Sequence, residues 1–170
     1  MIYLVEGLNC SGKTTWIKEQ PCVDIDNVIN TPFANPLRFT GLKKFLSDIF
    51  DFNPYYYGAY ETILELNTQI GQNDVWFWDR TWISAWVYGS ITNKRIFDEL
   101  VRIYTDHCKV IFIDTPVDEC LKRWKERDNA GKEYVDLQKD WRLLREKFVE
   151  TVNILEARGM NVQRIESSKE

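Results

Sequence analysis

The chain has 170 residues, enough for one domain with a substantial core, and its 44% hydrophobic and 28% charged residues are ordinary for a globular protein. A net charge of −4 argues against general nucleic-acid binding, and no uninterrupted apolar run approaches the length of a membrane span. The first apolar residues run directly into a glycine-rich segment and not into a secretory signal, so we expect a cytoplasmic location.

Short apolar runs alternate with amphipathic segments along the chain. Runs typical of buried strands predict strands at residues 1–5, 22–26, 75–78, 110–113 and 162–165. Apolar residues at helical spacing predict helices at 14–20, 42–50, 55–70, 83–88, 94–104, 117–127 and 135–158. This alternation indicates an α/β fold with a parallel sheet, in which ligands bind beyond the carboxyl ends of the strands.

The segment from Gly7 to Thr15 reads GLNCSGKTT and fits G-x-x-x-x-G-K-[ST], the phosphate-binding loop. Its glycines let backbone N–H groups face phosphate oxygens, its lysine adds a cation, and its hydroxyl can ligate Mg²⁺. The alternative is a glycine turn with an accidental lysine, but the predicted strand and helix around the segment favour the loop. We expect Lys13 to be catalytic and Thr14 to hold the metal. The residues expected to bind the nucleotide are Gly7, Asn9, Cys10, Ser11, Gly12, Lys13, Thr14 and Thr15.

Acidic residues accompany two other predicted strands. Asp79 and Arg80 follow the strand at 75–78, where the carboxylate can hold Mg²⁺ and the arginine can bind an acceptor phosphate bidentately. Asp24 and Asp26 alternate in the strand at 22–26 and so point to one side, where Asp24 could act as a base and Asp26 could hold an acceptor hydroxyl. A structural salt bridge and a capping role are the respective alternatives.

Residues 121–147 carry nine basic and six acidic side chains, a local positive charge that suits a small anionic ligand. Arg123 and Arg127 lie four positions apart on one helix face, just before a polar, glycine-containing segment. A lid at about residues 123–135 would place these arginines over a transferring phosphoryl group and exclude water. A solvated basic helix face is the alternative.

Aromatic residues gather at two places. Tyr56 and Tyr60 belong to the tyrosine-rich start of the helix at 55–70, and Trp82, Trp86 and Tyr88 follow the Asp-Arg pair. We expect most of them to pack in the core and at least one to line a flat acceptor pocket, because aromatic faces can stack on a nucleobase.

Together these segments resemble the thymidylate kinase and deoxynucleoside kinase group of P-loop kinases. Glu6 to Thr15 looks like the thymidylate kinase loop, where an aspartate usually stands at position 9. Asp79-Arg80 with Ser84 and Tyr88 is similar to that family's D-R-Y-x-x-S-x-x-A-Y pattern, with threonine at position 81 in place of tyrosine. The resemblance implies a single P-loop kinase domain over residues 1–170, an α/β three-layer sandwich with a five-stranded parallel sheet, helices on both faces and a small helical lid.

The resemblance also implies ATP as the phosphoryl donor and Mg²⁺ as cofactor. It implies that Arg80 contacts the acceptor end and that Arg123 or Arg127 is the lid arginine, and it is compatible with a homodimer. We place Mg²⁺ at Thr14 and Asp79. The residues expected to contact the acceptor are Asp26, Tyr56, Tyr60, Arg80, Ser84 and Tyr88.

The chain departs from the family in its acceptor half. Residues 58–61 read GAYE, where thymidylate kinases usually carry an arginine for the monophosphate, and residues 23–27 read VDIDN where an arginine-proline signature is usual. The arginine that deoxynucleoside kinases carry at position 86 is replaced by tryptophan. The donor half is therefore well matched and the acceptor half is not.

We expect an ATP-dependent phosphotransferase, a nucleotide or nucleoside kinase that transfers the γ-phosphoryl group to a small, deoxynucleotide-type acceptor. One alternative is a kinase of a hydroxyl on nucleic acid, at a strand end or a hydroxymethylated base. Asp24-x-Asp26 and the basic segment favour that alternative, and the acidic balance disfavours it. The other alternative is a non-catalytic nucleotide-binding protein.

Overall fold

The computed structural model describes residues 1–21, 28–29, 75–126 and 140–167. Its centre is a five-stranded sheet in the order β2-β3-β1-β4-β5, and every neighbouring pair of strands is parallel. The strands are β1 (Ile2–Glu6), β2 (Val28–Ile29), β3 (Trp76–Asp79), β4 (Cys108–Asp114) and β5 (Asn161–Glu166). The described helices are α1 (Lys13–Lys18), α4 (Trp82–Val87), α5 (Lys94–Tyr104), α6 (Val117–Glu126) and α8 (Trp141–Ala157).

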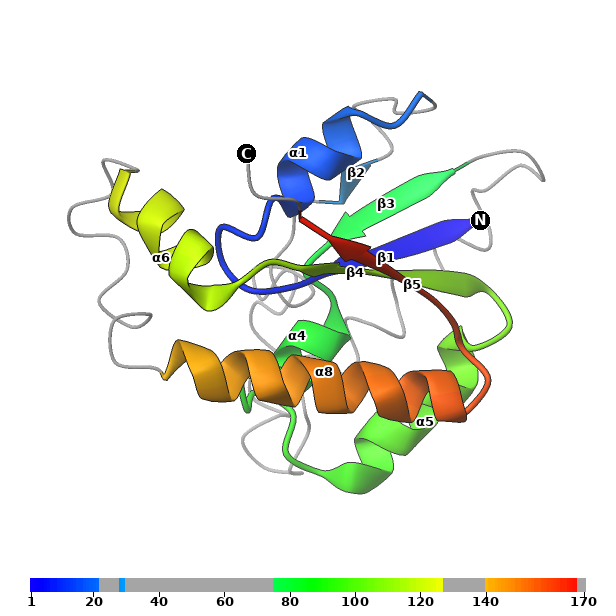
Figure 1. Ribbon diagram of the computed structural model, residues 1–170. Helices are drawn as coiled ribbons and strands as arrows, with labels where there is room; N and C mark the ends of the chain where they lie inside the picture. The colour runs from blue at the N-terminus through cyan, green and yellow to red at the C-terminus, as the bar shows by residue number, and fades with distance from the viewer. Residues whose placement is uncertain (22–27, 30–74, 127–139, 168–170) are drawn as a thin grey trace, which may run out of the picture.

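Helices lie on both faces of the sheet (Figure 1). The central strands are apolar at nearly every position, so alternate side chains enter different cores. Leu4 and Trp78 pack in the core under α4 and α5, whereas Val5 and Phe77 pack on the opposite face against Ile17 of α1. The sheet is thus buried on both sides, as parallel sheets require.

Helix α8 forms a second core on the α4 face. Its Phe148 stacks on the Phe112 ring of β4 at a centroid distance of 6.1 Å, and Leu8 of the glycine-rich segment belongs to the same core. Asp140 caps the helix by accepting hydrogen bonds from the backbone N–H groups of Arg142 and Leu143. The long helix therefore braces the segment that follows β1.

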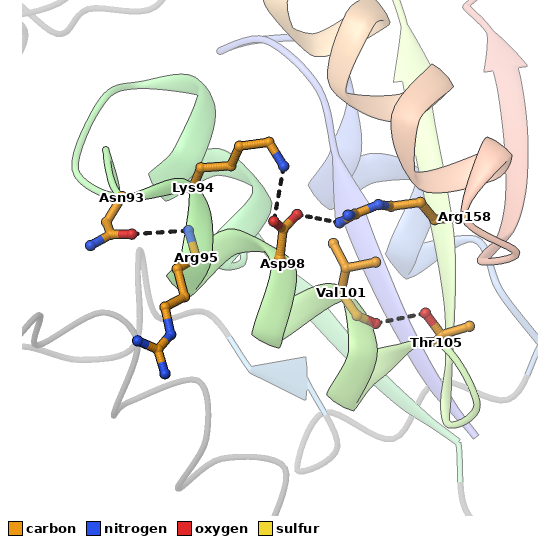
Figure 2. Close-up of polar contacts among 7 residues, drawn as sticks. All are labelled: Asn93, Lys94, Arg95, Asp98, Val101, Thr105 and Arg158. Carbon is orange, nitrogen blue, oxygen red and sulfur yellow. Dashed lines mark hydrogen bonds and ion pairs between the residues drawn. The ribbon is translucent and has the colours of Figure 1, made fainter.

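Figure 2 shows an ionic contact that joins α5 to the carboxyl end of α8. Asp98 accepts hydrogen bonds from Lys94 on its own helix and from Arg158, which follows α8. Asn93 caps α5 through the backbone N–H of Arg95. All these side chains lie at or near the protein surface, so the contact adds little to stability.

The sequence prediction of an α/β fold with a parallel sheet and helices on both faces is confirmed for the described residues. The strand predicted at 22–26, the helices predicted at 42–50 and 55–70, and residues 127–135 of the predicted lid lie outside them. None of the helices in the described part of the chain has the length and apolar character that a membrane-spanning helix needs.

Candidate functional site

The segment between β1 and α1 forms a tight loop at the carboxyl edge of the sheet, close to α6 (Figure 1). Gly7 has φ 147°, and a Cβ at this position would lie only 2.6 Å from the carbonyl oxygen of Ile113. Gly12, with φ 98°, directly precedes α1. The loop thus needs glycine at two of the positions that the motif specifies, once for space and once for a left-handed backbone.

Lys13 begins α1 and is buried beneath its own loop. Its Nζ donates hydrogen bonds to the carbonyl oxygens of Gly7 at 3.1 Å and Leu8 at 2.7 Å. Burial and, to a lesser extent, the nearby Arg80 cation lower the pKa of Lys13 to about 8, although Asp79 and Glu6 oppose the shift. The Lys13 ammonium group is therefore held within the loop, where the motif predicts that phosphates bind.

Thr14 and Asp79 meet at the mouth of the loop. The Thr14 hydroxyl donates to Asp79 Oδ2 at 2.9 Å, and Asp79 Oδ1 is buried without a hydrogen-bond partner among the described residues. A buried carboxylate oxygen with spare lone pairs beside a hydroxyl is a donor set suited to Mg²⁺, which binds through one or two protein oxygens, water and substrate phosphates. These two residues fit the predicted metal.

Glu6 ends β1 and has no solvent exposure. It accepts hydrogen bonds from the Thr81 backbone N–H at 2.7 Å, from the Thr81 hydroxyl at 2.6 Å and from the Ser84 hydroxyl. Burial raises the pKa of this carboxyl, and the three donors oppose that rise. Sequence reasoning gave Glu6 no role, although a glutamate that closes an apolar strand just before the loop was a usable signal.

Arg80 lies in the chain between Asp79, which contacts Thr14, and Thr81, which contacts Glu6. Its φ is 63°, in the left-handed region that residues other than glycine rarely adopt. Its backbone N–H donates to the carbonyl of Val5 at 3.1 Å, which adds one bond beyond the β1–β3 ladder. The turn therefore redirects the chain from β3 into α4 at the arginine itself.

Arg123 of α6 reaches toward the loop from the other side. Its Nη1 lies 3.6 Å from the position that a Cβ on Gly12 would occupy, and its Nε donates to Glu119 at 2.9 Å. The loop is also braced from β4, because the Thr115 hydroxyl donates to the carbonyl of Ser11 at 2.8 Å. The sheet edge thus carries cations on both sides of the loop.

An ion pair that the sequence analysis missed closes the end of β4. Arg145 of α8 binds Asp114 with two hydrogen bonds of 2.8 Å each. This bidentate pair ties α8 to the edge on which the loop lies. The two residues are 31 positions apart and no local sequence pattern links them, so the pair could be identified only from the fold.

The structure brings together Gly7, Gly12, Lys13, Thr14, Asp79, Arg80 and Arg123 at one edge of the sheet. Cys10 and Ser11 are buried in the loop, and Thr15 is exposed on α1. Asn9 and Tyr88 border a narrow gap together with Trp141 and Leu144, so both lie on the side of the loop that faces α8.

Ser84, which we expect to contact the acceptor, has a fully buried side chain, and its hydroxyl donates to Glu6. Trp82 packs against Phe97 and Tyr104 in the core, and Trp86 stacks on Phe97. Other residues expected at the site lie outside the described part of the chain, namely Asp24, Asp26, Tyr56, Tyr60 and Arg127.

No protein-family model matches the sequence, and no curated protein matches it significantly. Solved structures do match. The YorR protein of Bacillus subtilis, in complex with phosphorylated GDP, aligns with 98% of this chain and 85% of its own at a TM-score of 0.64 and 16% identity. Thymidylate kinase from Candida albicans aligns over 99% of this chain and 84% of its own, with a TM-score of 0.56 and 15% identity.

Deoxyadenosine kinase from M. mycoides with bound dATP covers 98% of this chain and 91% of its own, with a TM-score of 0.54 and 13% identity. Similarity at these identities is similarity of fold. The chain therefore shares its fold with these three solved structures, two of which are a thymidylate kinase and a deoxyadenosine kinase.

Proposed function

We propose that this chain is an ATP-dependent, Mg²⁺-requiring phosphotransferase. The observation that carries the proposal is the 2.9 Å hydrogen bond between Thr14 and Asp79 at the mouth of a glycine-rich loop. A phosphate loop alone would support nucleotide binding. A loop hydroxyl joined to a strand-end carboxylate with one oxygen in reserve adds the metal position that phosphoryl transfer uses.

Each described residue of the site has a role in this proposal. The loop backbone and Lys13 hold the β- and γ-phosphates, after Lys13 exchanges the carbonyls of Gly7 and Leu8 for phosphate oxygens. Thr14 and Asp79 hold Mg²⁺, which neutralises phosphate charge when bound. Arg123 lies beside the loop, where a cation stabilises the charge that builds on the transferring group.

We further propose that the acceptor is a nucleoside or nucleotide of the deoxynucleotide type. The fold is shared with proteins named as thymidylate kinase and deoxyadenosine kinase and with one solved in complex with phosphorylated GDP. Arg80, which follows the metal-binding Asp79, is the residue that we assign to the acceptor end, because a planar guanidinium binds phosphate or sugar oxygens with defined geometry. Residues 123–135 are proposed to form the lid.

An ATP-consumption screen tests the proposal. The acceptor panel contains deoxynucleosides, their monophosphates, guanosine nucleotides, and single- and double-stranded DNA with and without hydroxymethylated bases. ADP formation that depends on a deoxynucleoside or a monophosphate supports the proposal. Formation that depends only on DNA would favour the nucleic-acid hydroxyl kinase, and ATP binding without ADP formation on any acceptor would favour a nucleotide-binding protein.

A further inference from the structure

Glu6 is a carboxylate with no access to solvent at the end of a strand whose other residues are almost all apolar. Burying such a charge is unfavourable unless hydrogen bonds and an opposite charge compensate for it. Three donors and the buried Lys13 cation supply that compensation. A buried charge with so complete a set of partners needs an explanation beyond filling space.

All three donors come from the four residues that follow Arg80. Thr81 contributes its backbone N–H and its hydroxyl, and Ser84 contributes its hydroxyl from the first turn of α4. The Thr81 oxygen also accepts from the Ile83 backbone N–H, so the hydroxyl that caps α4 is the one that binds Glu6. Glu6 therefore fixes the start of α4 to the end of β1.

Arg80 lies between the two points that are fixed. On its amino side, its own N–H is bound to Val5, and on its carboxyl side Thr81 is bound to Glu6. Its left-handed backbone is of the kind that persists only where the surroundings hold it in place. Asp79, by contrast, belongs to β3 and is held by pairing with Val5.

We infer that Glu6 is a positioning residue, which holds Arg80 in its left-handed turn and so sets the place of the acceptor relative to the phosphate loop that begins at Gly7. This inference rests on the proposed function, because it takes Arg80 as the acceptor-binding residue. Glu6 would thus link the acceptor-binding Arg80 to the loop that binds the phosphoryl donor. Loss of Glu6 should then weaken acceptor use and leave ATP binding largely intact.

The test compares the full chain with Glu6→Ala, Glu6→Gln and Thr151→Val. We call the hydrogen bonds of Glu6 with Thr81 and Ser84 the clamp. Glutamine can keep the clamp without a charge, because its carbonyl oxygen can accept from Thr81 while its amide donates to the Ser84 hydroxyl. Thr151 is a buried hydroxyl on α8, so Thr151→Val controls for loss of a buried polar group away from the loop. Ser84→Ala removes a single donor with little change in volume.

Hydrogen exchange of residues 79–85, measured without ligand, reads the clamp itself. We expect at least tenfold faster exchange in Glu6→Ala, a smaller increase in Ser84→Ala, and rates within threefold of the parent protein in Glu6→Gln and Thr151→Val. Unchanged exchange in Glu6→Ala would overturn the clamp, whether or not the chain is a kinase. If the parent protein phosphorylates nothing on the panel, the proposed function fails and this measurement still decides whether the clamp exists.

Steady-state kinetics with ATP and the acceptor identified by the screen measure how the loss of the clamp affects acceptor use. For Glu6→Ala we expect kcat/KM for the acceptor to fall at least tenfold while the KM for ATP changes less than threefold, and Glu6→Gln should recover most of the loss. An equal effect on ATP and acceptor, no recovery in Glu6→Gln, or the same kinetic loss in Thr151→Val would each contradict the positioning role.

Discussion

The hydroxyl of Thr14 donates a 2.9 Å hydrogen bond to the carboxylate of Asp79, although the two residues are 65 positions apart in the sequence. The bond exists because β1 and β3 are parallel neighbours, so the loop after one strand meets the turn after the other. Parallel topology thus brings together two sequence segments, one after each strand, that we propose to bind Mg²⁺.

Removal of the Asp79 carboxylate should weaken metal use most. In Asp79→Asn we expect kcat to fall at least tenfold and the Mg²⁺ concentration for half-maximal activity to rise, because one of the two residues proposed to bind Mg²⁺ loses its charge. A Mg²⁺ titration of ADP formation measures both. The control is Asp98→Asn in the ionic contact between α5 and Arg158, which should change neither quantity; an unchanged Mg²⁺ requirement in Asp79→Asn would contradict the assignment.

Lys13→Ala should lower turnover more than tenfold with the fold intact. The substitution removes the cation that the loop holds for the phosphates, and the loop backbone remains. Steady-state ADP formation and circular dichroism measure the two effects. Lys18→Ala, which changes an exposed lysine on the same short helix, is the matched control. Near-normal turnover in Lys13→Ala would remove the basis for a phosphate loop.

Gly7→Ala should destabilise the protein more than Gly89→Ala. Both glycines have positive φ, but a Cβ at Gly7 would lie 2.6 Å from the Ile113 carbonyl, whereas a Cβ at Gly89 meets nothing within 4 Å. Backbone strain alone costs about 1 kcal/mol at such positions, and the clash adds to it at Gly7 only. Urea unfolding of the two variants measures the difference, and equal losses would mean that the loop can shift to accommodate the methyl group.

Arg123→Ala should lower kcat at least tenfold while the KM for ATP changes by less than threefold, since the arginine is proposed to act on charge that develops during transfer. Arg95→Ala on α5 provides a control, because Arg95 also pairs with a glutamate four positions away but lies far from the loop in the chain. Steady-state kinetics separate the two constants. Retention of kcat in Arg123→Ala would transfer the lid role to Arg127.

The stability difference between the parent protein and Glu6→Gln should depend on pH. Burial raises the pKa of Glu6 in the folded state, so between its unfolded value near 4.5 and the raised folded value the native protein holds more of this proton than the unfolded chain does. The contribution of Glu6 to the free energy of unfolding therefore falls as pH increases through that window. Urea unfolding of both proteins from pH 4 upward measures it, and a difference that grows in the opposite direction would contradict the raised pKa.

Features coded by neighbouring residues were predictable from the sequence. The helix predicted at 94–104 coincides with α5, because its apolar spacing and its Asn93 cap are local signals. β4 begins two residues earlier than predicted, since pairing of Cys108 with Ile2 extends the strand beyond its most apolar run. The boundary is therefore set by a neighbouring strand and not by the segment itself.

The candidate site divides in the same way. Thr14 and Asp79 were predicted to share the metal because each carries its own motif signal, and the structure places their side chains in contact. The partners of Glu6 lie 75 and 78 positions away, so nothing beside it in the sequence indicated a clamp.

Lys13 donates two hydrogen bonds to the carbonyls of Gly7 and Leu8, so these carbonyl oxygens compete with an incoming anion for the lysine. Any anion that binds must replace these two carbonyl oxygens as hydrogen-bond acceptors of the Lys13 ammonium group. An anion with a single charge replaces those bonds poorly, whereas a polyphosphate offers several oxygens to the lysine and to the loop N–H groups at once. The resting loop should therefore discriminate among anions before any acceptor is present, in favour of those with the longest phosphate chains.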